Sequence, residues 1–184
     1  MTGVSETTLG ELREVCRIPG MDIPLPKSPF YTVLLSTIPV LVRTMFRIRY
    51  RGVHRLPRKG PMILAANHTS HIDPFAVIAG ARRRTHYLAK DSHFDKIFTA
   101  FVMNSTGQIR THRESGAADA LSRGSDILKA GLVMGIFPEG TRTITGKLSQ
   151  LKKGGFHLAI NTKAKILPVV VKGLFQIKPK TQWL

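Results

Sequence analysis

The sequence predicts an α/β fold: a mostly parallel central sheet covered by helices, with an amphipathic, interfacial helix near the N-terminus. Three observations lead to this prediction. Short aliphatic runs recur along the chain, longer stretches with helical spacing separate them, and an apolar segment near the N-terminus runs into a cluster of arginines. Strands that alternate with helices form parallel sheets whose faces the helices cover. A chain of 184 residues is long enough for one such domain with a substantial core.

The first element along the chain is the apolar segment 29–42, which predicts a helix lying at a membrane interface. It is shorter than the ~20 residues that cross a bilayer, and Pro39 interrupts it. Seven Lys and Arg residues and no carboxylate lie between Arg43 and Lys59, which suits contact with lipid phosphates. A helix buried against the domain is the alternative interpretation.

The remaining elements follow within one domain. We divide the chain into an N-terminal segment, residues 1–46, and this domain, residues 47–184. Four aliphatic runs have the length and composition of buried strands: residues 62–66, 86–89, 132–137 and 166–171. Helical spacing of apolar residues predicts helices around residues 94–101 and 117–128. In such sheets the working residues gather where strands end and loops begin.

The N-terminus does not have the pattern of a secretory signal. Its first 20 residues contain three glutamates and no apolar core segment. Cys16 is the only cysteine, so an internal disulfide is impossible and a reducing compartment is expected. Together with the interfacial helix, these features predict a peripheral or monotopic protein on the cytoplasmic face of a membrane.

The charge balance narrows the classes of partner. Lys and Arg number 28 against 11 Asp and Glu, a formal net charge of +17, and no acidic residue follows Glu139. A field of this sign attracts anionic lipids, acidic carrier proteins, phosphorylated substrates or nucleic acid. No recognised nucleic-acid-reading motif is present, so a basic nucleic-acid-binding module is the remote alternative. The sequence also lacks metal-ligand spacings and glycine-rich nucleotide loops, so we expect neither a metal nor a cofactor.

The first candidate site directly follows the aliphatic run 62–66. It is the octapeptide Asn67-His68-Thr69-Ser70-His71-Ile72-Asp73-Pro74. Asp73 and Pro74 predict the start of a helix. A turn between His68 and Asp73 would let the carboxylate hold one imidazole nitrogen while the other accepts a proton from a substrate hydroxyl. Two alternatives stay open: Asp73 only caps the helix, or His71 is the base.

The second candidate site lies at the end of the run 132–137. It is the hexapeptide Phe137-Pro138-Glu139-Gly140-Thr141-Arg142. Gly140 permits a tight bend with exposed N–H groups, Thr141 adds a hydroxyl, and Arg142 offers a planar fork for a phosphate. Glu139 could orient that arginine or accept a hydrogen bond from a substrate hydroxyl. A surface turn with a local Glu–Arg ion pair is the alternative interpretation.

Taken together, the two sites resemble the motifs of the glycerolipid acyltransferase family, whose best-known members are the 1-acyl-sn-glycerol-3-phosphate acyltransferases. The first family motif, Asn-His-x4-Asp, matches Asn67, His68 and Asp73. The third, Phe-Pro-Glu-Gly-Thr-Arg, matches residues 137–142 at every position. These two motifs in this order are highly specific.

Two weaker motifs extend the resemblance over residues 45–173. Residues 107–113 resemble the second family motif, with a glycine, an apolar residue and a final arginine. Residues 166–170 resemble the fourth, an apolar strand that contains a proline. His71 stands where the family often carries an aromatic residue.

The resemblance implies that His68 is the catalytic base, oriented by Asp73. It also implies that four residues bind the phosphate and glycerol of the acceptor: Arg113, Glu139, Gly140 and Arg142. We add Thr141, through its hydroxyl, to these substrate-binding residues. The implied reaction moves a fatty-acyl group from acyl-CoA or acyl carrier protein to the free hydroxyl of 1-acylglycerol 3-phosphate. Its product is phosphatidic acid, for phospholipid biosynthesis. The expected partners are the lysophospholipid, the thioester donor and an anionic membrane surface.

The motifs leave the acceptor and the donor open, because acyl-chain and headgroup pockets lie in less recognisable segments. Glycerol 3-phosphate and other lysophospholipids are the alternative acceptors. The sequence ends at Leu184, sooner than many family members, which often continue through another strand. If that strand is needed for catalysis, a lipid-binding protein without catalysis is a further alternative.

Overall fold

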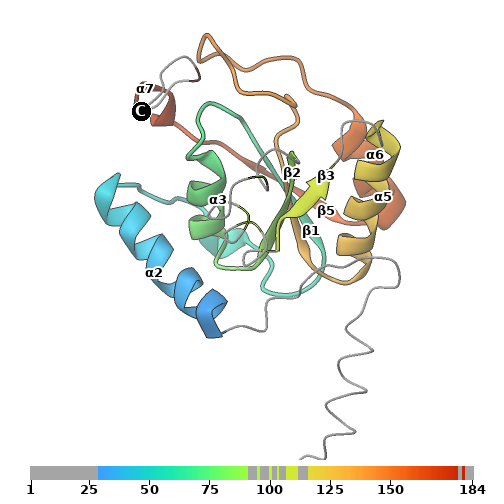
Figure 1. The fold of residues 1–184 in the computed structure, drawn as a ribbon, viewed down its shortest axis with the longest axis horizontal. Coiled ribbons are helices and arrows are strands. Elements are labelled where there is room, and N and C mark those ends of the chain that lie inside the picture. Colours follow the sequence, from blue (N-terminus) through green and yellow to red (C-terminus); the bar gives the residue numbers. More distant parts are fainter. Residues whose placement is uncertain are drawn as a thin grey trace, which may run out of the picture.

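The structure is a computed structural model, and it describes residues 29–90, 95, 100, 103, 107–111, 116–177 and 180. Within these residues, five strands form one sheet in the order β3-β2-β4-β1-β5 (Figure 1). The strands are β1 (Met62–Ala66), β2 (Thr85–Lys90), β3 (Ile109–Thr111), β4 (Val133–Ile136) and β5 (Lys165–Val169). Every neighbouring pair is parallel. The predicted α/β fold with a parallel central sheet is therefore confirmed.

All four predicted aliphatic runs form strands, with ends that differ from the prediction by two residues at most. The strand β3 was not predicted. Its three residues include a single aliphatic side chain, Ile109, which is buried in the core. A run this short and mixed does not stand out from a loop in the sequence, and its pairing with β2 is what makes it a strand.

Helices cover both faces of the sheet (Figure 1). On one side lie α2 (Pro29–Met45) and α3 (Asp73–Ala81), and on the other α5 (Gly116–Lys129) and α6 (Gly154–Thr162). Two short helical turns complete the described elements: η1 (Val53–Arg55) and α7 (Leu174–Ile177). The helix α5 confirms the one predicted around residues 117–128, whereas most of the helix predicted around residues 94–101 lies outside the described residues.

The core consists of two apolar layers separated by the sheet. The strand β1 supplies both, because alternate side chains of a strand point to opposite faces. Ile63 joins the layer beneath α5 and α6 together with Ile127 and Leu158. Met62 and Leu64 join the layer that contains Val77 of α3. Burial on both faces explains why the strand reads as a continuous aliphatic run.

The predicted N-terminal helix is present as α2, which packs on α3. Of the helices within the described residues, none combines the length and the hydropathy that a bilayer crossing requires. Residues 1–28 lie outside the described part of the chain. The location of α2 at a membrane interface and the division into residues 1–46 and 47–184 stay predictions.

Strand order places the two candidate sites side by side. The strand β4 lies next to β1, with Ala65 paired to Ile136. Both strands therefore end at the same level of the sheet, and the loops that contain the two motifs leave from neighbouring positions. This carboxyl edge of a parallel sheet is where binding sites of α/β folds form.

Candidate active site

The loop between β1 and α3 brings His68 and Asp73 together. Nδ1 of His68 lies 3.1 Å from Oδ2 of Asp73; the Asp73 side chain is 0% exposed and the His68 side chain 18% exposed. Because Nδ1 faces the carboxylate, Nε2 is the nitrogen left to meet a substrate. His71, the other imidazole of this loop, is exposed at the surface. The imidazole that meets Asp73 is therefore that of His68.

The Asp73 carboxylate shapes the loop instead of capping the helix that follows. Its Oδ2 accepts hydrogen bonds from the N–H groups of Thr69 at 2.5 Å and Ser70 at 2.7 Å. Its Oδ1 accepts a hydrogen bond from the Thr69 hydroxyl at 3.2 Å. These donors precede Asp73 in the chain, while Ile72 occupies the N-cap position of α3 without a side-chain cap bond. The interpretation that Asp73 only caps the helix is therefore wrong.

A stack of three rings supports the His68 imidazole. Its centroid lies 3.9 Å from that of Phe137 with 12° between the ring planes, and Phe137 in turn stacks on Tyr87 at 5.3 Å and 18°. Gly135 makes room for this stack, because a Cβ atom there would stand 2.2 Å from Cζ of Tyr87. A glycine inside a strand is typical of such a close approach.

Glu139 holds the backbone of the His68 loop. Its Oε1 accepts a hydrogen bond from the N–H of His68 at 2.7 Å, and its Oε2 accepts one from the N–H of Ser149 at 2.9 Å. The carbonyl of His68 accepts a further bond from the N–H of Thr143 at 2.9 Å. Among the described residues Glu139 forms no ion pair with Arg142, so the local Glu–Arg pair considered from the sequence is not formed.

The guanidinium of Arg142 lies near enough to Asp73 for their charges to interact. Burial lowers the pKa of its guanidinium, and the negative charge of the nearby Asp73 acts in the opposite direction. Nη1 of Arg142 is buried and has no hydrogen-bond partner within the described part of the chain. A buried donor without a partner is costly, so this nitrogen is available to an anion that enters the site.

Two lysines add positive charge at the same turn, and the sequence analysis did not single them out. Lys152 lies over Gly140, where a Cβ atom would stand 2.7 Å from Nζ, and its backbone N–H donates to the carbonyl of Pro138 at 2.8 Å. Nζ of Lys180 donates to Oγ1 of Thr141 at 3.3 Å. The only sequence signal for them was the lysine excess after Glu139, which does not distinguish one lysine from another.

The structure does not test two of the predictions, the role of Arg113 and the absence of a metal or cofactor. Arg113 lies outside the described residues. Within the residues that are described, no three or more His, Cys, Asp or Glu side chains gather in a way that could hold a metal ion. The expectation that the protein needs no metal or cofactor stays a prediction.

Comparison with known proteins identifies the relatives of this chain. A family model described as Acyltransferase matches residues 47–172. A 1-acyl-sn-glycerol-3-phosphate acyltransferase from Borreliella burgdorferi is 33% identical over 127 residues, which cover 68% of this chain and 51% of that protein. The chloroplastic 1-acyl-sn-glycerol-3-phosphate acyltransferase LPAT1 from Arabidopsis thaliana is 27% identical over 143 residues, covering 76% and 40% respectively. The chain thus spans about half the length of the curated relatives it matches.

A solved structure shares the fold. The crystal structure of the 1-acyl-sn-glycerophosphate acyltransferase PlsC from Thermotoga maritima superimposes with a TM-score of 0.73 at 23% sequence identity. The superposition covers 86% of this chain and 67% of that one. At this level of identity the similarity establishes the architecture of the sheet and its helices.

Proposed function

This chain belongs to the acyltransferase family, and from that premise we propose that it acylates the free hydroxyl of 1-acylglycerol 3-phosphate, forming phosphatidic acid. The observation that carries the proposal is the pairing of His68 with the buried Asp73, beside the guanidinium of Arg142. Curated relatives that carry the name of this reaction support the choice of acceptor. Membership of an acyltransferase family also argues against the alternative function considered from the net charge, a nucleic-acid-binding module.

The proposed chemistry needs one proton acceptor and one leaving group. Nε2 of His68 takes the proton of the acceptor hydroxyl while that oxygen attacks the thioester carbonyl carbon. The C–O ester bond forms, the C–S bond breaks, and the departing thiolate takes the proton back from the imidazolium. Asp73 holds the ring through Nδ1 and stabilises its positive charge. No serine or cysteine nucleophile is required, because the substrate supplies the attacking oxygen.

The proposed acceptor site is the cationic turn after β4. The buried Nη1 of Arg142, which has no hydrogen-bond partner among the described residues, supports an anion at this position. Lys152 and Lys180 add positive charge around Gly140 and Thr141. An arginine can grip a phosphate with two parallel hydrogen bonds. We assign Arg113 to the same phosphate from the motif resemblance alone. Glu139 acts as a positioning residue, since both of its oxygens already accept backbone hydrogen bonds.

The donor is acyl-CoA or an acylated carrier protein, and the substrates are met at the cytoplasmic face of a membrane. Exposed apolar side chains along α2, among them Leu41 and Met45 at 58% and 62% exposure, support contact with lipid. The basic strip that follows α2 supports contact with anionic headgroups. Flotation with anionic and neutral vesicles tests this, and equal association with both would argue against an electrostatic contribution.

The decisive assay incubates the purified chain with labelled acyl-CoA or acyl carrier protein and a panel of acceptors, with products resolved by mass spectrometry. The panel contains 1-acylglycerol 3-phosphate, glycerol 3-phosphate and lysophosphatidylcholine. We expect phosphatidic acid as the main product, formed by the wild type and not by His68→Ala. A main product from one of the other acceptors would replace the proposed substrate, and undiminished product from His68→Ala would remove the proposed mechanism.

A further inference from the structure

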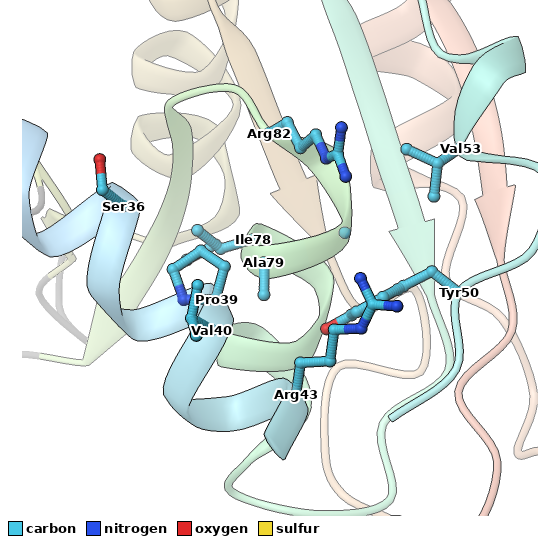
Figure 2. A pocket seen from close by; sticks show the side chains of 10 residues that line it. Ser36, Pro39, Val40, Arg43, Tyr50, Val53, Ile78, Ala79 and Arg82 are labelled. Carbon is cyan, nitrogen blue, oxygen red and sulfur yellow. The ribbon is translucent and has the colours of Figure 1, made fainter. Parts of the chain in front are cut away.

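A groove separate from the catalytic site lies between α2 and α3. Its volume is about 470 Å³, within the range of small-molecule sites. Figure 2 shows its walls. They include Val40 and Arg43 of α2, Tyr50 and Val53 from the segment between α2 and β1, Ile78 of α3, and Arg82 directly after α3. The groove residues that belong to α3, Ile78, Ala79 and Gly80, lie in its C-terminal half, whereas Asp73 begins that helix. Ile78, the groove residue of α3 nearest to Asp73, is about 7.5 Å from it along the helix axis at 1.5 Å per residue. None of the described residues of the candidate active site lines the groove, so the groove is a different site.

The polar part of the groove is cationic. Arg43 of α2 lies beside the ring of Tyr50, and Arg82 lines the groove from the end of α3 (Figure 2). Among the described residues, no acidic side chain lines the groove, and neither arginine forms an ion pair. The Tyr50 hydroxyl is already used, since it donates to the carbonyl of Ala76 at 3.2 Å. Two guanidinium groups without a carboxylate partner favour an anionic occupant.

The apolar part of the groove continues onto an exposed face of α2. Val40 lines the groove and is 61% exposed, and Val33 on the same helix is 57% exposed. The hydroxyls of Thr37 and Thr44 on this helix donate to the carbonyls of Val33 and Val40, at 2.8 and 2.9 Å. Threonines bonded in this way do not need water as a partner. The face beside the groove therefore suits hydrocarbon.

We infer that this groove binds one anionic phospholipid, with its phosphate between Arg43 and Arg82 and an acyl chain along Val40 and Ile78. The ligand is a component of the membrane and not the acyl acceptor, so the inference goes beyond the proposed function. The two arginines would bind the negatively charged phosphate of the lipid. The apolar wall, which continues onto the exposed face of α2, would contact its acyl chain. A lipid held there would tie α2 to α3 and orient the catalytic edge of the sheet at the membrane.

The test measures binding of dihexanoyl phosphatidylglycerol, below its micellar concentration, to the purified full chain by isothermal titration calorimetry. Dihexanoyl phosphatidylcholine and inorganic phosphate are the comparison ligands. We expect Arg43→Gln and Arg82→Gly each to weaken phosphatidylglycerol binding about 10- to 100-fold, as loss of a charged contact would. Glycine suits the positive φ of 51° at position 82, so the second variant should fold. Arg58→Gln removes an exposed arginine elsewhere and should bind as the wild type does.

A second pair of variants leaves the arginines in place. Val40→Glu sets a carboxylate at the groove and should abolish binding. Ile160→Glu adds the same charge to an exposed position of α6, away from the groove, and should not. Arg142→Ala, at the catalytic site, should also leave binding unchanged, which separates this site from the proposed active site. Equal binding of phosphatidylcholine or of inorganic phosphate would overturn the inference. The inference would also be overturned if Arg142→Ala lost phosphatidylglycerol binding while the groove variants kept it.

Discussion

The backbone N–H of His68 donates to Oε1 of Glu139 at 2.7 Å, although the two residues are 71 positions apart in the sequence. The other oxygen of the buried Glu139 accepts from Ser149. The carboxylate thus joins the His68 loop to the turn after β4, and this link would fix the distance between the proposed proton acceptor and the proposed phosphate site.

Glu139→Gln tests whether this link positions the base. A glutamine would turn its NH₂ group toward one of two backbone N–H donors, so one hydrogen bond to a charged group is lost, worth roughly 1.5–3 kcal/mol. We expect kcat to fall about 10- to 100-fold with little change in the acceptor KM. Steady-state kinetics separate the two quantities. A raised acceptor KM at normal kcat would show instead that Glu139 contacts the acceptor.

His68→Ala should lower kcat by about 10²- to 10⁴-fold, because it removes general-base assistance, while acceptor binding persists. Asp73→Asn should also slow turnover, since the imidazolium loses its counter-charge and the ring its orientation. His71→Ala, which removes the exposed imidazole of the same loop, is the control and should keep its activity. If His71→Ala were the inactive variant, the assignment of the base would move to that residue.

Arg142→Ala should raise the acceptor KM about 10- to 100-fold, because a charged contact to the phosphate is lost. The donor KM should stay near its wild-type value. Arg142→Lys should restore little, since an ammonium group cannot form the paired contact of a guanidinium. Lys147→Ala removes an exposed charge from the following loop and serves as the control. An effect confined to the donor KM would contradict the phosphate assignment.

Gly135→Ala should destabilise the protein and disturb the ring stack. The added Cβ would meet the Tyr87 ring at 2.2 Å, and overpacking of this kind costs about 1–3 kcal/mol. Gly154→Ala is the matched control, because its Cβ would find only Leu121 at an ordinary 3.7 Å. Denaturant unfolding of the two variants provides the comparison. Equal stability would mean that Tyr87 does not need the space at position 135.

His86 predicts a loss of stability on the acid side. Burial lowers its pKa, with a further lowering by Arg84 and a partial offset from the hydrogen bond to the Gly107 carbonyl. Below about pH 6.5, the ordinary pKa of histidine, the unfolded chain binds a proton that the folded chain excludes. The free energy of unfolding therefore decreases as the pH is lowered. His86→Gln should flatten this decline. Unfolding curves at pH 7.5 and pH 5.5 check it, and parallel declines in both proteins would contradict it.

Part of the fold could be predicted because local chemistry marks it. The run Met62–Ala66 was predicted with the ends that β1 has, since burial on both faces makes such a strand aliphatic throughout. The helix α6 was not predicted, because it begins with Gly154 and Gly155 and has no capping side chain at Lys153. Its position is set by the packing of Leu158 against Ile63 and Met134 in the core.

The candidate reactive side chains of the site could be predicted from the sequence. The hydrogen bonds that hold their loops in place could not. His68, Asp73 and Arg142 have side chains whose chemistry can be inferred from their type and spacing. The link from Glu139 could not be inferred, because its partners are backbone N–H groups, which every residue except proline possesses. The same holds for Asn67, whose side chain exchanges two hydrogen bonds with the backbone of Val171 at 2.7 and 2.9 Å.

The sequence by itself determined which groups can react: an imidazole with a carboxylate in one loop, and a guanidinium on a glycine turn in another. Only the tertiary structure decided that these loops meet. Strands adjacent in sequence are often neighbours in a sheet, yet here β4 inserts between β1 and β2. The pairing of Ala65 with Ile136 then ends both strands at one level. That choice depends on how two apolar layers pack around the sheet, a property of all the strands together that no single motif encodes.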